Sequence, residues 1–238
     1  MALYPLENNP EVLNHYIERL GVPRPMLHFV DVYGVSEELL GMVPGLVFAV
    51  LFVYPITNKI EVGLRLMSEE QKVKVRGLMK RSPIFFMKQE VENSCGTVAL
   101  LHALLNNYNS IGNIKDDSIL VELHEAPQYE EARESPEILG SLVKENKFLA
   151  AAHTETAFEG DSENRPINTS IDLHFSCFVW AWDFCVELDG RKERPLLHGA
   201  CSSREEFLRE TAKTIEKRMS LDTSLQTFSI TALVSTST

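Results

Sequence analysis

Cys95 begins an apolar segment, a place where a thiol can serve as a nucleophile. The polar residues 89–94 run directly into the apolar stretch 98–105, and this change predicts a helix that begins near Cys95. The first turn of a helix offers unpaired N–H groups and the positive end of the helix dipole, and both stabilise a thiolate. Position alone leaves a reactive and a structural role for this cysteine equally open.

The other three cysteines have simpler interpretations. Cys177 and Cys185 lie in apolar stretches and are expected to be small core residues, while Cys201 follows a Gly-Ala pair in an expected loop. Four cysteines in 238 residues are too few for a disulfide framework, and no CxxC spacing indicates a zinc site. The composition therefore favours a reducing compartment and gives no support for bound zinc.

A thiolate nucleophile needs a base, and His174 is the best placed of the seven histidines. It opens an aromatic stretch, and Asp189 ends the next apolar stretch, so these residues are neighbours if the two stretches pair as strands. A carboxylate there would fix the imidazole tautomer and leave the other ring nitrogen free to take the proton of Cys95. Spacing alone leaves other histidine–carboxylate pairs open. We expect three histidines to lie on helices, in structural or surface roles: His15, His102 and His124.

Gln89 stands before the cysteine in the same polar segment and is a candidate hydrogen-bond donor. Its amide, together with the backbone N–H of Cys95, would stabilise the negative oxygen that forms when a thiolate attacks a carbonyl. A glutamine in a solvated loop is the simpler interpretation, and the residue type alone favours it.

Caps, turns and hydrophobic periodicity predict the elements of the first half of the chain. The continuous apolar run Leu46–Tyr54 predicts a strand buried on both faces, and Ile60–Leu64 after a turn is expected to be a second strand. Ser68-Glu69-Glu70-Gln71 has a capping-box pattern, which predicts the start of a charged helix. The remaining predictions are a helix from Asn9 and Pro10 to Gly21, a strand at Leu27–Tyr33 and a short helix opened by Ser36.

An irregular segment divides the elements expected in the second half. Ala151–Ser170 is rich in small and polar residues and shows neither strand nor helix periodicity, which predicts a long loop of functional importance. The elements expected around it are polar helices within 113–148, paired strands at His174–Trp182 and Phe184–Leu188, a helix from Ser203 to about Met219 and a strand at Thr227–Ser235.

Charge and composition argue against several classes of function. The formal net charge of −11 argues against nucleic acid, whose phosphates require a basic face. It favours a basic partner if there is one, but in most proteins such a charge is only a solvated surface, so the charge alone does not decide. The longest apolar run is about half as long as a membrane-crossing helix needs, and the first residues lack the pattern of a secretory signal. No repeat or linker divides the chain. We therefore expect a single domain over residues 1–238, without a membrane partner, in the cytoplasm or also the nucleus.

The candidate motifs together resemble those of the ubiquitin carboxyl-terminal hydrolases, a family of cysteine proteases with a papain-like active site. The resemblance extends from about residue 4 to about residue 235 and is closest to the short, single-domain members. Separated motifs in the right order make it specific. They are Pro5-Leu6-Glu7 with Asn9-Pro10-Glu11-Val12, Phe29-Val30-Asp31-Val32-Tyr33-Gly34, Phe86-Met87-Lys88-Gln89 with Asn93-Ser94-Cys95-Gly96-Thr97, and Asp172-Leu173-His174-Phe175 with Glu187-Leu188-Asp189-Gly190-Arg191-Lys192.

This resemblance implies a fold and a set of catalytic roles. The implied fold is α+β, with a central antiparallel sheet flanked by helices and a knotted backbone, which is rare among proteins. Cys95 would be the nucleophile, His174 the general base and acid, Asp189 the orienting carboxylate and Gln89 the oxyanion donor. No metal or organic cofactor is implied.

The resemblance also implies ubiquitin as the partner of a monomeric enzyme. The irregular segment at about 151–170 would be a crossover loop that arches over the cleft and limits the size of the leaving group. We hypothesise ubiquitin contacts from the N-terminal segment and from this loop, namely Pro5, Leu6, Glu7, His153, Thr154 and Glu155.

The expected activity is that of a deubiquitinating thiol hydrolase, which cleaves small adducts or short peptides after the C-terminal glycine of ubiquitin. Two alternatives are a ubiquitin-binding protein with little turnover and a hydrolase for another ubiquitin-like modifier. One stretch departs from the family. Between His174 and Asp189 its members usually carry an Asp-Gly turn, whereas this chain reads Val179-Trp180-Ala181-Trp182-Asp183-Phe184. The two tryptophans either expose an aromatic patch or pack against a neighbouring element.

Overall fold

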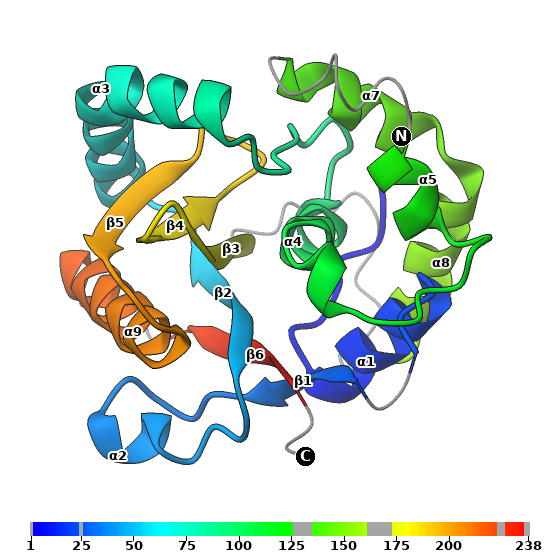
Figure 1. Ribbon diagram of the computed structural model, residues 1–238, viewed down its shortest axis with the longest axis horizontal. Coiled ribbons are helices and arrows are strands. Elements are labelled where there is room, and N and C mark those ends of the chain that lie inside the picture. The colour runs from blue at the N-terminus through cyan, green and yellow to red at the C-terminus, as the bar shows by residue number, and fades with distance from the viewer. Residues whose placement is uncertain (1, 24–25, 126–134, 161–172, 223–226, 236–238) are drawn as a thin grey trace.

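A six-stranded antiparallel sheet, in the order β1-β6-β2-β3-β4-β5, forms the centre of the molecule. The computed structural model describes residues 2–23, 26–125, 135–160, 173–222 and 227–235. Helix α4 stands between the sheet and the helices α5, α7 and α8, and α1 packs on β1 and α8 (Figure 1). Helix α9 and the first part of α3 lie on the other side of the sheet. The α+β class and the antiparallel sheet flanked by helices are confirmed.

The elements have the following bounds. The strands are β1 Leu27–Asp31, β2 Val47–Pro55, β3 Leu173–Ala181, β4 Phe184–Leu188, β5 Leu196–Ala200 and β6 Ser229–Ser235. The helices are α1 Pro10–Arg19, α2 Glu37–Leu40, α3 Asn58–Arg81, α4 Cys95–Leu105, α5 Ile119–Glu125, α7 Pro136–Glu145, α8 Lys147–Ala157 and α9 Arg204–Leu221, with a 3-10 turn at Tyr108–Ser110.

Two hydrophobic cores lie on opposite faces of the sheet. One contains α4 and the inward faces of α1 and α5, and the other contains α9 and part of α3. Every residue of β2 is buried, as expected for a strand covered on both faces. Alternate residues of this strand supply the two cores, with Leu51 in the first and Phe52 in the second. The sheet therefore holds α4 rigidly on one face while its other face is also excluded from water.

The caps predicted at Asn9 and Ser203 form as the sequence indicates. The Asn9 side chain accepts the N–H of Glu11 at 2.9 Å, and Gly21 has a φ of +104° after the end of α1. Ser203 accepts the N–H of Glu206 at 3.2 Å and begins α9. The helices at Pro10 and Ser203 and the strands at Leu27 and Leu46 are thus confirmed within a few residues.

The prediction for residues 57–71 is wrong, because this region is one long helix. Thr57 accepts the N–H of Ile60 and begins α3, so Ile60–Leu64 is helical and the capping box at Ser68 lies inside the helix. Ile60 and Leu64 stand four residues apart, which fits one face of a helix as well as one face of a strand. The hydroxyl of Ser68 accepts Arg194 Nη1 at 3.0 Å instead of capping a helix.

The prediction of a loop at 151–170 is also wrong for residues 151–157, which belong to a helix. Asn146 caps α8, which continues to Ala157, so the small residues at 150–152 are helical. Alanine has the highest helix propensity, and reading these small residues as loop formers was the error. Residues 161–170 lie outside the described residues. Strand β5 at Leu196–Ala200 had no sequence prediction and pairs with β4 at the sheet edge.

The two tryptophans pack against neighbouring elements. Trp182 and Asp183 have φ values of 56° and 59° and form the two-residue tip of the β3–β4 hairpin. The Trp182 indole N–H donates to Ser82 O at 2.7 Å, and the Trp180 indole N–H donates to Cys201 O at 3.0 Å. The hairpin tip is thereby tied to the end of α3 and to the segment before α9.

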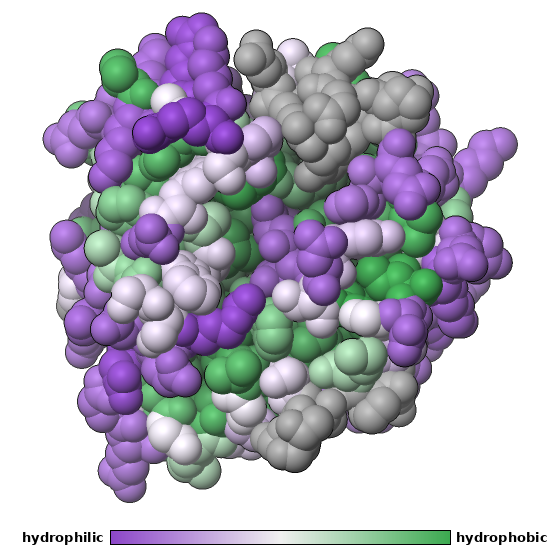
Figure 2. Space-filling model, viewed as in Figure 1, coloured by the Kyte–Doolittle hydropathy of each residue, from purple (hydrophilic) through white to green (hydrophobic). Residues whose placement is uncertain are grey.

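A buried charged pair joins α9 to the sheet. Arg218 donates through both terminal nitrogens to the two oxygens of Glu187, with His198 Nε2 at 2.9 Å from the same carboxylate. Burial alone would raise the pKa of Glu187, but the Arg218 guanidinium holds it well below its usual range. Figure 2 shows hydrophilic side chains at the surface over α3 and α9. Arg218 and Glu187 differ from these because their charged groups are buried.

We expect Arg218→Met to destabilise the protein by about 3–5 kcal/mol at pH 7, because it leaves a buried carboxylate without its cation. The lowered pKa of Glu187 means that the pair stabilises the fold above the unfolded-state value and that this contribution is lost as pH falls. Without Arg218, burial of the Glu187 carboxylate favours its protonated form. The difference in unfolding free energy between wild type and variant should therefore shrink between pH 7 and pH 5. Urea unfolding at several pH values measures this difference. The double variant Glu187→Leu/Arg218→Met should have an unfolding free energy closer to that of wild type. If the single and double variants lose the same free energy, the unpaired buried carboxylate is not the cause.

Candidate active site

The nucleophile candidate Cys95 is the first residue of α4 and is partly exposed. Ser94 precedes it without forming a side-chain cap, since its hydroxyl donates to Val91 O at 2.7 Å. Asn93 has a left-handed φ of 62°, which is uncommon for a residue with a side chain and turns the chain sharply into the helix. The N–H groups of the first turn are thus left uncapped by Ser94 beside the thiol.

His174, on the second residue of β3, lies beside this thiol and is almost fully buried. Its Nε2 is 2.7 Å from Asp189 Oδ1, and the imidazole also hydrogen-bonds the Cys95 side chain. The pairing of β3 with β4 brings His174 and Asp189 to the same end of the sheet, as the sequence predicted. The structure therefore brings the three expected residues into one hydrogen-bonded series.

Electrostatics favour an ion pair between Cys95 and His174. Burial would raise the pKa of Cys95, but hydrogen bonds from His174 and from the backbone N–H groups of Phe175 and Gly96 lower it below its ordinary value. Burial would likewise lower the pKa of His174, but the charge and hydrogen bond of Asp189 and the contact with Cys95 raise it. A thiolate beside an imidazolium is the expected state near neutral pH.

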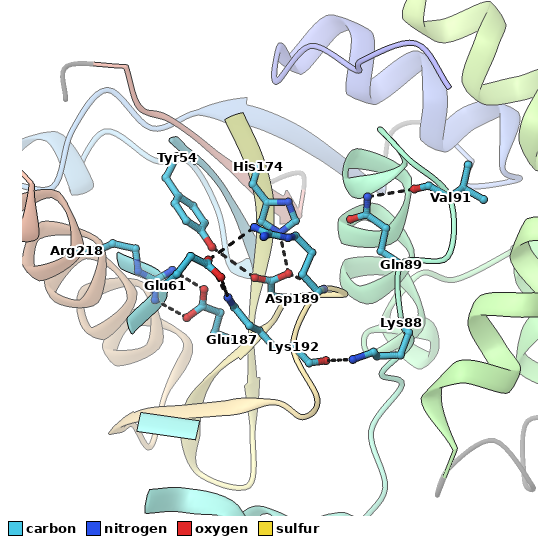
Figure 3. Close-up of polar contacts among 11 residues, drawn as sticks. Tyr54, Glu61, Lys88, Gln89, Val91, His174, Glu187, Asp189, Lys192 and Arg218 are labelled. Atoms are coloured by element: carbon cyan, nitrogen blue, oxygen red, sulfur yellow. Dashed lines mark hydrogen bonds and ion pairs between the residues drawn. The ribbon is translucent and has the colours of Figure 1, made fainter. Parts of the chain in front are cut away.

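Asp189 is a buried carboxylate that several donors keep ionised. The backbone N–H of Arg191 donates to Oδ1 at 2.9 Å, and the Tyr54 hydroxyl donates to Oδ2 at 3.4 Å (Figure 3). Burial would raise its pKa, but the positive charge of His174 and its hydrogen bond lower it. Gly190 follows in a confined place, because a Cβ there would stand 2.8 Å from Val98 Cγ1 and 3.0 Å from the backbone nitrogen of Gln89.

Gln89 lies in the segment that leads to the nucleophile (Figure 3). Its backbone N–H donates to Gly190 O at 2.9 Å, and its side-chain nitrogen donates to Val91 O at 3.1 Å. The side-chain amide carries two N–H groups, so one can hold the loop while the other is offered to a substrate oxygen. The contact with Gly190 places the oxyanion candidate next to the residue that follows Asp189.

Side chains that had no predicted role hold this irregular segment in place. Asn106 accepts the N–H of Phe85 at 2.8 Å and donates to its carbonyl at 2.9 Å. His102 Nε2 accepts the N–H of Met87 at 3.1 Å, and burial lowers the pKa of His102 to about 4, so the ring stays neutral. Both residues belong to α4 or its end, and their only sequence signal was a polar side chain in an apolar helix.

The six expected ubiquitin contacts lie in different environments. Leu6 packs on Gly96 and is 7% exposed, and His153 is fully buried between Thr97 and Tyr4. Neither side chain offers a surface to a partner here, because each completes the core around α4. The others lie on the N-terminal segment and on α8 and are partly or fully exposed: Pro5, Glu7, Thr154 and Glu155.

The remaining cysteines lie away from Cys95. Cys177 and Cys185 are buried in strands, as predicted, and burial raises the pKa of both thiols. Cys201 is also buried, and its pKa is raised to about 11. Within the described part of the chain, no group of three or more histidine, cysteine or acidic residues is arranged to hold a metal ion.

We expect iodoacetamide to alkylate Cys95 alone in the folded protein at pH 6–7, since only this thiol has a lowered pKa. The rate should fall as pH drops through that pKa. His174→Asn should move the pH dependence to higher values, whereas His15→Asn, the same change on α1, should not. Mass spectrometry of the digested protein measures both the alkylated site and the rate. An unchanged pH dependence of alkylation in His174→Asn would contradict the ion pair.

Comparisons with known proteins agree with this geometry. The family model of "Ubiquitin carboxyl-terminal hydrolase, family 1" matches residues 3–220. "Ubiquitin carboxyl-terminal hydrolase 3" of Arabidopsis thaliana is 36% identical over 96% of this chain and 92% of its own length. "Ubiquitin carboxyl-terminal hydrolase isozyme L1" of Homo sapiens is 37% identical over 90% of this chain and 89% of its own length.

Solved structures show the same fold. The UCH37 catalytic domain of Trichinella spiralis, solved bound to ubiquitin vinyl methyl ester, has a TM-score of 0.75 at 18% identity, covering 99% of this chain and 97% of that one. A second structure of UCH37 from this organism, with the same ligand, has a TM-score of 0.69 at 16% identity, covering 98% and 82%. The family match over most of the length, with the arrangement of Cys95, His174 and Asp189, places this chain in the ubiquitin carboxyl-terminal hydrolase family.

Proposed function

We propose that this protein is a deubiquitinating thiol hydrolase, which cleaves amide, ester or thioester bonds after the C-terminal glycine of ubiquitin. The observation that carries the proposal is the hydrogen-bonded series of Cys95, His174 and Asp189 in a chain of this family. An isolated cysteine at a helix start would support only a reactive thiol, whereas a base with its own buried carboxylate supports acyl transfer.

Acylation uses the preformed ion pair. The Cys95 thiolate attacks the carbonyl carbon of the terminal glycine, and its electron pair forms the carbon–sulfur bond. The resulting oxyanion accepts hydrogen bonds from the Gln89 amide and the backbone N–H of Cys95. His174 gives its proton to the leaving amine or alcohol as the tetrahedral intermediate collapses, and Asp189 holds the ring in place.

Deacylation returns the enzyme to its first state. Water attacks the thioester carbonyl while neutral His174 removes its proton, and the same two donors stabilise the second oxyanion. Collapse breaks the carbon–sulfur bond, releases ubiquitin with a free carboxylate and leaves the thiolate beside the imidazolium.

Ubiquitin is the partner that the comparisons support for this chain. Both Trichinella spiralis structures hold ubiquitin vinyl methyl ester, and the curated relatives carry ubiquitin hydrolase names. The net charge of −11 complements the basic C-terminal tail of ubiquitin, so electrostatic attraction should speed their encounter and weaken with salt.

The alternative of a ubiquitin-binding protein with little turnover is disfavoured by the geometry. His174 contacts both Asp189 and Cys95, so the three side chains are placed for turnover. The alternative of another ubiquitin-like modifier is tested by comparing the same reporter group on both proteins.

Three further expectations are part of the proposal. The protein acts as a monomer, it works in the cytoplasm or also the nucleus, and the segment that follows α8 limits the size of the leaving group. The four free thiols suit a reducing compartment. Among the described residues, no helix is both long and apolar enough to cross a membrane.

We expect the wild-type protein to release a fluorogenic amine from the C-terminus of ubiquitin and Cys95→Ala to release none. Ubiquitin affinity, measured by calorimetry, should stay near wild type in this variant, because the thiol contributes chemistry and little contact area. Cys201→Ala is the matched control and should keep its rate. Equal, slow release by wild type and Cys95→Ala would eliminate the proposed hydrolase.

Gln89→Ala should lower kcat on the same reporter by about 10²–10³ with little change in KM, because it removes a donor that acts on the oxyanion. Gln71→Ala is the matched control, since Gln71 bonds the backbone of Leu197 in the edge strand β5. A normal kcat in Gln89→Ala would remove Gln89 from the oxyanion site.

A further inference from the structure

Tyr54, near the end of β2, lies against the triad from the side opposite the nucleophile. It stands directly across from His174 in the β2–β3 ladder, and its ring meets the imidazole edge-on with 5.9 Å between centroids. The side chain is fully buried in the core between the sheet and α9. Tyr54 was not among the residues that the sequence singled out.

The two oxygens of Asp189 have different partners. Oδ1 faces His174 Nε2 at 2.7 Å and also accepts the N–H of Arg191. Oδ2 points the other way, where the Tyr54 hydroxyl is its hydrogen-bond donor among the described residues, at 3.4 Å (Figure 3). Because Asp189 is 2% exposed, water does not replace this donor easily.

The environment keeps Tyr54 neutral and therefore a donor. Burial and the negative charge of Asp189 raise its pKa well above the ordinary value, so the hydroxyl proton stays on oxygen throughout the neutral range. The guanidinium of Arg218 lies over the ring at 5.1 Å and is itself held by Glu187. The ring is thus fixed from both sides, and its hydroxyl has a defined direction.

We propose that Tyr54 is a positioning residue for the hydrolysis. Its hydroxyl holds the second oxygen of Asp189 and thereby limits how strongly Asp189 stabilises the protonated form of His174. A carboxylate that accepts three hydrogen bonds is less basic than one that accepts only two. An imidazolium beside a less basic carboxylate gives up its proton more readily, and proton donation to the leaving group requires this.

Other titratable and charged groups surround Asp189, His174 and Tyr54 and set the background for this effect. They come from the turn after β4, from α4, α3, β4 and α9: Arg191, Lys192, Cys95, His102, Glu61, Glu187 and Arg218. None of them is altered when the Tyr54 hydroxyl alone is removed, so Tyr54→Phe isolates its contribution while the ring is kept.

The test measures the pKa of His174 by NMR with carbon-13-labelled histidine. Cys95→Ala serves as the background, which removes coupling to the thiol, and His174→Gln in that background assigns the signal. Tyr54→Phe should raise the His174 pKa by roughly 0.5–1 unit. Tyr16→Phe is the matched control, because Tyr16 also loses a buried hydroxyl, one that contacts Thr97 at 2.8 Å, and it should leave the His174 pKa unchanged.

An unchanged or lower His174 pKa in Tyr54→Phe would overturn the proposal, even if the variant were less stable. If Tyr54→Phe does not fold, 3-fluorotyrosine placed at position 54 tests the same idea with the opposite sign. Its hydroxyl is a stronger donor, so the His174 pKa should fall, and a rise or no change would count against the role of Tyr54.

A kinetic measurement rests on the proposed function and complements the NMR titration. The alkaline limb of kcat/KM for ubiquitin amide hydrolysis reports loss of the His174 proton, and Tyr54→Phe should move it to higher pH by a similar amount. Its kcat should fall about threefold to tenfold with KM unchanged. Because the NMR titration needs no substrate, failure of the hydrolase assay and failure of the Tyr54 proposal are distinguishable.

Discussion

The contact between Cys95 and His174 is the interaction on which the rest of the active site depends. It joins the first turn of α4 to the start of β3, and each partner shifts the other toward its charged form. Such a pair is useful only when both backbones are immobile, because a small displacement separates thiolate from imidazolium. Helix α4 meets this requirement by being apolar almost all round and buried from Gly96 to Leu105. The sheet packs against it on one side and α5 on another, and Thr97 links it to Tyr16 of α1 and His153 of α8 (Figure 1).

The oxyanion side of the site is built on different principles. The segment between α3 and α4 has little regular structure, so its backbone groups take partners from surrounding side chains. Asn106, His102 and the carbonyl of Gly190 each hold one point of it, and Trp182 holds its start through Ser82. Gln89 therefore owes its position to many side chain-to-backbone contacts. This arrangement explains why a buried neutral histidine lies in α4, which is otherwise nearly free of polar side chains.

Buried charge is concentrated at one end of the sheet. Asp189, Arg218 and Glu187 follow one another from the triad, with Tyr54 between Asp189 and the guanidinium. Opposite charges alternate along this path, which compensates each for its loss of water. The second core thus reaches the triad through the contact of Tyr54 with Asp189.

The sequence by itself determined the local elements and the residue types of the site. Composition and spacing predicted the features that depend on near neighbours in the chain. These are the caps at Asn9 and Ser203, the buried run of β2 and the helix start at Cys95. The sequence failed at Ile60–Leu64 and at residues 151–157, where short patterns fit more than one structure. Only the tertiary structure decided that Tyr54 reaches Asp189, that His153 is buried and that His102 supports Met87. These contacts depend on strand register and on helix packing across the whole fold, and both arise from residues far apart in the chain.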